Sequence, residues 1–150
     1  MISYDRNRRN RSDQYHDNIV GTVEQAMGVR SIRQSTLQED LRGIDHWFTG
    51  EMWDAPDTEA TFQFKCQFST DFETWTVQRN QWQYDTNFYA FAHIPTRKVY
   101  IIDGETLKSL PRSLYDGPKT NQPFFYGQLE DLVWHGAVVA DLVGVAGGIY

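Results

Sequence analysis

The stretch "ATFQFKCQFS", residues 60–69, alternates apolar and polar side chains, and this alternation decides how the middle of the chain is expected to fold. A period of two places successive side chains on opposite faces of a β-strand. One predicted face is apolar and consists of Phe62, Phe64 and Cys66. The opposite face carries Gln63 and Lys65. The apolar face is typical of a strand that packs on a core, whereas the lysine requires either water or an acidic partner.

The residues around this strand predict an α+β domain with a central mixed, mostly antiparallel sheet flanked by helices. A leading helix is expected over residues 12–27, where apolar residues follow a helical stripe and Gly28 provides the stop. Strand 61–68 is expected to form a hairpin with residues 41–48 across a turn rich in Gly, Pro and Asp. The later elements are expected as strands over 74–79, 88–93 and 99–103, a short helix over 104–110, a loop over 111–123 and a helix over 128–143.

The chain has 150 residues, 40% of them hydrophobic and 15% aromatic, which is typical of a globular protein. We therefore expect a single domain over residues 12–150. No apolar run is long enough to cross a bilayer, and no apolar stretch follows the Arg-rich start, so neither a membrane span nor a secretory signal is expected. These features predict a cytoplasmic protein, in the host cell if a phage encodes it. Cys66 is the only cysteine, which excludes an internal disulfide and a zinc site built mainly from thiolates.

The net charge of -6 is unevenly distributed along the chain. Seven acids between residues 39 and 59 accompany a single basic residue, Arg42. Residues 1–11 form a predicted disordered basic arm, whose candidate phosphate contacts are Arg6, Arg8, Arg9 and Arg11. An acidic zone beside a basic arm is the pattern of a metal site with a phosphate-binding flank, or of a solvated loop beside a disordered tail.

The predicted hairpin brings three polar residues toward one another. Asp45 lies in its first arm, and Gln63 and Lys65 lie on one face of its second arm. Neighbouring strands are about 4.8 Å apart, so the Asp45 carboxylate and the Gln63 amide oxygen can share a cation. Two such ligands suit Mg²⁺ or Mn²⁺, which keep waters that a phosphate can displace. Lys65 would then orient or deprotonate the attacking water and stabilise negative charge on the phosphate.

The sequence at these positions resembles the PD-(D/E)XK nuclease superfamily. Its signature is an aspartate at the end of one strand followed by acid-x-lysine on the next, and it matches "GID" at residues 43–45 and "QFK" at residues 63–65. The resemblance extends to the order of elements over residues 12–110 and is greatest to small phage and bacterial members. It implies a restriction-endonuclease-like fold and a Mg²⁺-dependent endonuclease that hydrolyses phosphodiester bonds, with DNA rather than RNA as the expected substrate.

The resemblance also implies roles for single residues. Asp45 and Gln63 correspond to metal ligands, and Lys65 corresponds to the catalytic cation. In this superfamily an acid from the first helix often joins the site, which makes Glu24 a fourth catalytic candidate. Gln63 stands where an acid is typical, so the metal site has one negative charge fewer. Separately from the resemblance, Arg79 is a candidate for contact with nucleic-acid phosphates.

Other interpretations of the same residues are open. A Gln-x-Lys face is also what a solvent-facing strand of an antiparallel sheet carries. The same fold without the second acid suits a non-catalytic module that binds a partner protein, forms a homo-oligomer or acts as a virion or accessory component. The acids of residues 39–59 also suit an acidic DNA mimic that inhibits a nucleic-acid-binding enzyme. A nuclease is expected to bind divalent metal and DNA, whereas a mimic is expected to bind neither.

Overall fold

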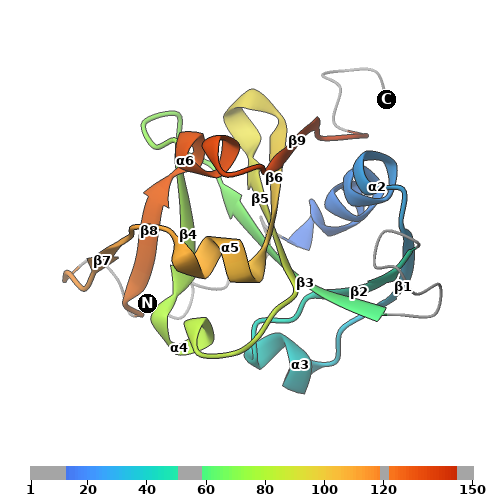
Figure 1. Cartoon of the computed structure of the whole chain (residues 1–150), viewed down its shortest axis with the longest axis horizontal. Coiled ribbons are helices and arrows are strands. Elements are labelled where there is room, and N and C mark those ends of the chain that lie inside the picture. The colour runs from blue at the N-terminus through green and yellow to red at the C-terminus, as the bar shows by residue number, and fades with distance from the viewer. Residues whose placement is uncertain (1–12, 51–58, 119–121, 145–150) are drawn as a thin grey trace.

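The computed structural model describes residues 13–50, 59–118 and 122–144, which form two β-sheets with helices around them (Figure 1). The larger sheet has six strands in the order β1 (Arg30–Gln34), β2 (His46–Thr49), β3 (Glu59–Gln67), β5 (Phe88–His93), β6 (Lys98–Asp103) and β9 (Val138–Asp141). Its neighbouring strands are antiparallel except for β3 and β5, which are parallel. The predicted α+β class with a mixed, mostly antiparallel sheet is confirmed. The predicted basic arm over residues 1–11 lies outside the described residues.

The two sides of the larger sheet are covered differently (Figure 1). The longest helix, α2 (His16–Met27), packs on one side. The other side is covered by an antiparallel sheet in the order β4 (Thr74–Gln78), β8 (Phe124–Gln128) and β7 (Ser113–Tyr115). The shorter helices are α3 (Leu37–Leu41), α4 (Arg79–Trp82), α5 (Gly104–Ser109) and α6 (Leu129–Trp134), with a 3-10 turn at Ile94–Thr96. Within the described ranges, no helix has the length and apolar character needed to cross a membrane.

Each side of the larger sheet has its own hydrophobic core, because side chains alternate along its strands. The core under α2 includes Ile19, Val23, Phe48, Phe62, Ala90 and Ile101. The core under the second sheet includes Trp75, Val77, Tyr89, Phe91, Ile102 and Leu107. Phe62 is fully buried under α2, and Phe64 and Cys66 are partly buried against the same core. The apolar face predicted for residues 60–69 is therefore the face that packs against α2.

Helix α2 ends where the sequence predicts. Gly28 has a φ of 67°, a left-handed conformation that glycine adopts without steric cost. Its N–H donates to the Glu24 carbonyl at 3.0 Å and closes the last turn. Strands β4, β5 and β6 and helix α5 also agree closely with their predicted ranges. In these segments the local pattern and the tertiary packing favour the same structure.

The prediction of one helix over residues 128–143 is wrong. Helix α6 ends at Trp134, and Gly136 then adopts a φ of 91°, which breaks the helical path. The chain continues as β9, which pairs antiparallel with β6. Val138 and Val139 are β-branched and suit a strand better than a helix once the glycine has separated them from α6.

The prediction that a strand runs from residue 41 to residue 48 is also wrong in its first half. Helix α3 ends at Leu41, a turn follows, and β2 starts only at His46. The segment between the predicted helix 12–27 and the predicted hairpin contains β1, which pairs with β2. The predicted loop over 111–123 contains β7. Strand β1 is exposed at all five positions, so it has no apolar alternation that a sequence pattern could reveal.

Candidate active site

Asp45 is fixed at the start of β2 by hydrogen bonds to the neighbouring strand β3. Its N–H donates to the Phe62 carbonyl at 2.7 Å, and its carboxylate Oδ2 accepts the Phe64 N–H at 2.7 Å. The side chain therefore lies against the backbone of the strand that carries Gln63 and Lys65. The predicted hairpin does bring these three residues together, since β2 and β3 pair antiparallel directly after Asp45.

Gln63 and Lys65 lie on the face of β3 that is turned away from α2. Their register partners in β5 are Tyr89 and Phe91, which belong to the core under the second sheet. Gln63 is only 1% exposed, so the interpretation of this face as a solvent-facing strand is wrong for Gln63. The antiparallel hairpin would leave the face open to water, but the chain after β3 folds back over it as β4 and α4.

A glutamine from α4 joins the site. The side-chain oxygen of Gln81 accepts a hydrogen bond from Gln63 Nε2 at 2.6 Å and another from Lys65 Nζ at 3.1 Å. Its Nε2 donates to the Asp40 carbonyl at 3.5 Å. We call the five residues that meet here the polar cluster: Asp40, Asp45, Gln63, Lys65 and Gln81. It combines two carboxylates, two amides and one partly buried amine from separate segments of the chain.

Burial controls the charges of the polar cluster. Removal from water disfavours the ionised carboxylate and, with the neighbouring Asp40 carboxyl, raises the pKa of Asp45 to about 8, although Lys65 acts in the opposite direction. Burial also lowers the pKa of Lys65, and Asp45 and Asp40 partly oppose this change. Both groups are thus closer to titration at neutral pH than their exposed counterparts. Shifts of this kind are common among residues that transfer protons or bind ligands.

One buried oxygen of the polar cluster has no hydrogen-bond partner in the described part of the chain. This atom is Gln63 Oε1, and it lies against Gly43 on the turn between α3 and β2. A Cβ atom at position 43 would lie 3.2 Å from the Gln63 oxygen, so the absence of a side chain at Gly43 avoids a close contact with this oxygen. A buried acceptor without a partner costs stability unless it serves a ligand. A free, buried amide oxygen fits the predicted role of Gln63 as an oxygen ligand for a cation.

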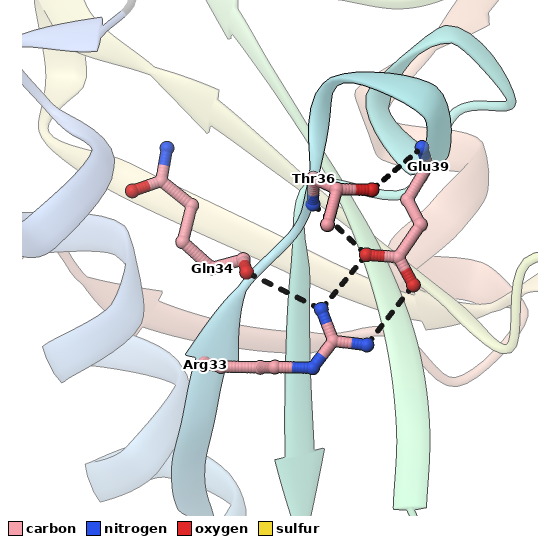
Figure 2. Close-up of polar contacts among 4 residues, drawn as sticks. All are labelled: Arg33, Gln34, Thr36 and Glu39. Carbon is pink, nitrogen blue, oxygen red and sulfur yellow. Dashed lines mark hydrogen bonds and ion pairs between the residues drawn. The ribbon is translucent and has the colours of Figure 1, made fainter.

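Helix α3, which carries Asp40, is held in a fixed orientation by the contacts of Glu39 with Arg33 and Thr36 (Figure 2). Both Glu39 oxygens bind the Arg33 guanidinium, at 2.8 and 3.0 Å. Glu39 also accepts the Thr36 N–H, while the Thr36 hydroxyl accepts the Glu39 N–H, so the two residues form a capping box. Arg33 belongs to β1, and the ion pair therefore ties α3 to the edge of the larger sheet.

The structure does not bring the other predicted site residues into the polar cluster. Glu24 is on α2, which packs on the opposite side of the sheet, and its carboxylate accepts the Ser31 N–H at 3.1 Å. Arg79 is exposed at the start of α4, two positions before Gln81, and its N–H donates to the Pro123 carbonyl. The predicted phosphate contacts of the basic arm, Arg6, Arg8, Arg9 and Arg11, lie outside the described residues.

Two members of the polar cluster could not be singled out from the sequence. Asp40 is one of the seven acids in the acidic zone, and nothing in its local pattern distinguishes it from its neighbours. Gln81 lies in the polar segment "RNQWQ", and glutamine carries no motif of its own. The only signal for Asp40 in the sequence is its short separation from Asp45 along the chain. A short turn between an acid and the motif aspartate can bring the two side chains together.

The donor set of the polar cluster limits what it can hold. Across residues 13–50, 59–118 and 122–144, no three histidine, cysteine, aspartate or glutamate side chains are arranged to hold a metal ion. A cation here would therefore depend on carboxylates, the Gln63 amide oxygen and water, which is a donor set for Mg²⁺ or Mn²⁺ rather than zinc. No family model, curated protein or solved structure matches the chain. The function is therefore inferred from the chemistry of the polar cluster.

Proposed function

We propose that the protein is a Mg²⁺- or Mn²⁺-dependent nuclease that hydrolyses phosphodiester bonds, with DNA as its expected substrate. The observation that supports this most is the meeting of Asp45, Gln63 and Lys65 in a partly buried cluster, where the side-chain oxygen of Gln63 has no hydrogen-bond partner among the described residues. A structural lysine would sit more favourably in water, because a buried amine is costly to desolvate. The polar cluster retains this unfavourable desolvation energy, which is expected of a functional site rather than of a region with a purely structural role.

Asp45 and Gln63 are the residues that would hold the cation. A bound Mg²⁺ would polarise a phosphoryl oxygen and neutralise its developing charge. The lowered pKa of Lys65 makes its neutral amine more available, and this form would accept a proton from the attacking water. The ammonium that results would place a positive charge beside the reacting phosphate. Asp45 must lose its proton to bind the cation, so cation binding and ionisation of Asp45 are coupled.

Gln81 controls access to Lys65 in this proposal. Its side-chain oxygen holds Lys65 Nζ and Gln63 Nε2 together, and α4, which carries it, is a single short turn. The Lys65 ammonium has further N–H donors, so a phosphate can bind it beside this oxygen or replace the oxygen. Arg79, exposed on the same turn, is suitably located to attract the phosphate backbone to the same region.

A cleavage assay tests the proposed function. Plasmid, single-stranded DNA and RNA are incubated with the protein in Mg²⁺, Mn²⁺ or EDTA, together with Lys65→Ala and the control Lys98→Ala. Lys98 is a partly exposed lysine of β6 that pairs with Asp141 and does not belong to the polar cluster. We expect metal-dependent cleavage, a loss of about 100-fold or more in Lys65→Ala, and activity near wild type in Lys98→Ala. Cleavage that survives in EDTA, or in Lys65→Ala, would contradict the proposal.

A non-catalytic module that binds a partner protein is the second candidate. Several large apolar side chains are exposed around α6 and β9: Val133, Trp134, Val138 and Val139. Trp134 is 78% exposed, which is unusual for a residue of its size unless a partner covers it. This candidate predicts no cleavage of any substrate and no Mg²⁺ binding, together with a defined oligomer or partner complex that Trp134→Ala weakens.

A further inference from the structure

We propose that Asp40 supplies the second carboxylate of the metal site. In the superfamily that the sequence resembles, an acid at the position of Gln63 typically has this role. This inference rests on the proposed nuclease function. Asp40 lies on α3, outside the hairpin that carries Asp45, Gln63 and Lys65. Its assignment depends on contacts within the polar cluster.

Asp40 lies beside the motif residues, because its backbone carbonyl accepts a hydrogen bond from Nε2 of Gln81, whose side-chain oxygen binds Gln63 and Lys65. Its carboxyl also contributes to the raised pKa of Asp45. The turn after α3 fixes this position, because the Gly43 N–H donates to the Asp40 carbonyl at 2.9 Å. Two carboxylates at such close range repel each other when both are ionised, and a divalent cation between them removes the repulsion.

The oxygen of Gln63 gives an independent indication of a ligand at the same place. The Gln63 residue is only 1% exposed, and its Oε1 atom has no hydrogen-bond partner among the described residues. This atom lies against Gly43, on the turn that joins Asp40 to Asp45. The unpartnered acceptor therefore points to the short segment that carries both carboxylates. Two carboxylates and one amide oxygen are a suitable partial shell for Mg²⁺, which completes it with water.

The neighbouring acid Glu39 is not available for this role. Both of its oxygens are engaged by the Arg33 guanidinium, and one also accepts the Thr36 N–H (Figure 2). These contacts orient α3 without any contribution from the Asp40 carboxyl. Asp40 is thus free of the capping interactions, and its replacement by Asn leaves the anchor of α3 intact.

Calorimetric titration with Mg²⁺ tests the assignment. The proteins compared are wild type, Asp40→Asn, Asp40→Glu and the control Asp85→Asn, whose carboxylate is fully exposed. We expect Asp40→Asn to weaken Mg²⁺ binding roughly tenfold or more, since even supporting groups around a metal contribute that much. Asp40→Glu keeps the carboxylate and should bind closer to wild type, and Asp85→Asn should match wild type. Circular dichroism verifies that each variant is folded.

A double variant makes the test sharper. If Asp40 provides the charge that Gln63 lacks, Asp40→Asn combined with Gln63→Glu restores Mg²⁺ binding toward the wild-type affinity. A wild type that binds Mg²⁺ and cleaves DNA while Asp40→Asn binds equally well would overturn this inference and leave the proposed function in place. A wild type with neither Mg²⁺ binding nor cleavage would overturn both. Weak binding in Asp40→Asn that Gln63→Glu does not restore would assign Asp40 to the fold and overturn the inference.

Discussion

The two faces of strand β3 show two different uses of burial. On the α2 side, Phe62 is surrounded by aromatic rings, with the Phe48 and Phe88 centroids 4.6 and 4.9 Å away. The polar residue on this side, His46, finds a partner for each ring nitrogen, His16 at 3.0 Å and Ser31 at 2.6 Å. On the other side, Gln63 and Lys65 share the acceptor Gln81, and the side-chain oxygen of Gln63 has no hydrogen-bond partner in the part of the chain that the structure describes.

This difference distinguishes a face built for stability from a face that retains unfavourable groups. Aromatic contacts and paired imidazoles lower the free energy of the folded state on the α2 side. A buried amine, a carboxyl with a raised pKa and an unpartnered oxygen raise it on the other side. We therefore expect substitutions on the α2 side to change stability most, and substitutions in the polar cluster to change ligand binding and catalysis most.

The largest effect on stability is expected from Phe62→Ala. Phe62 is fully buried, and truncation of a buried aromatic side chain costs about 3–5 kcal/mol in the free energy of unfolding. Denaturant unfolding monitored by tryptophan fluorescence measures this loss. The control is Phe72→Ala, because Phe72 is 56% exposed and its truncation should change stability by no more than about 0.5 kcal/mol. Equal losses in the two variants would remove the distinction between the faces.

A smaller loss is expected from Gln81→Leu. This change removes the acceptor shared by Gln63 Nε2 and Lys65 Nζ, and buried donors without a partner cost about 1–3 kcal/mol. The exposed Gln83 on the same segment allows the matched control Gln83→Leu, which should leave stability nearly unchanged. An unaltered free energy of unfolding in Gln81→Leu would mean that the polar cluster is open to water.

The next effect concerns the pH dependence of Mg²⁺ binding. Burial and Asp40 raise the pKa of Asp45 to about 8, so below this pH the cation must displace a proton. The association constant for Mg²⁺ should therefore rise by up to about tenfold per pH unit between pH 6 and 8, and level off above. Calorimetric titrations at several pH values measure it. A pH-independent association constant would show that Asp45 is already ionised, or that it does not bind the cation.

The smallest effect comes from His46, whose pKa is lowered to about 4 by burial and by the nearby His16. The folded state binds this proton less tightly than the unfolded state, so the stabilising contribution is complete above pH 6.5 and is lost as the pH falls toward 4. At pH 6 the loss should be below about 1 kcal/mol. The measurement is the difference in unfolding free energy between wild type and His46→Gln from pH 8 to 4. A difference that stays constant over this range would show that His46 does not titrate on unfolding.

Sequence patterns predicted the elements in which local preference and packing agree. The alternation of residues 60–69 identified β3 and its buried face, and Gly28 identified the end of α2. The patterns failed where tertiary pairing decides the structure, as in the exposed strand β1 and in β9, which was predicted as helix. Within the candidate site, the meeting of Asp45, Gln63 and Lys65 was predictable from hairpin geometry. Asp40 and Gln81 were not, because they come from other elements and follow no pattern.

The parallel pairing of β3 and β5 also sets the order in which the chain can fold. Strands β2 and β3, like β5 and β6, are antiparallel neighbours that short connections can join early, whereas β3 and β5 meet only after a crossover that contains β4 and α4. Gln81 is carried by that crossover, so it reaches Gln63 and Lys65 only when the crossover docks. Local unfolding of the same segment would uncover Lys65 while the core under α2 stays closed. In the proposed nuclease, the docking of this crossover would therefore decide both when the site is complete and when Lys65 is accessible.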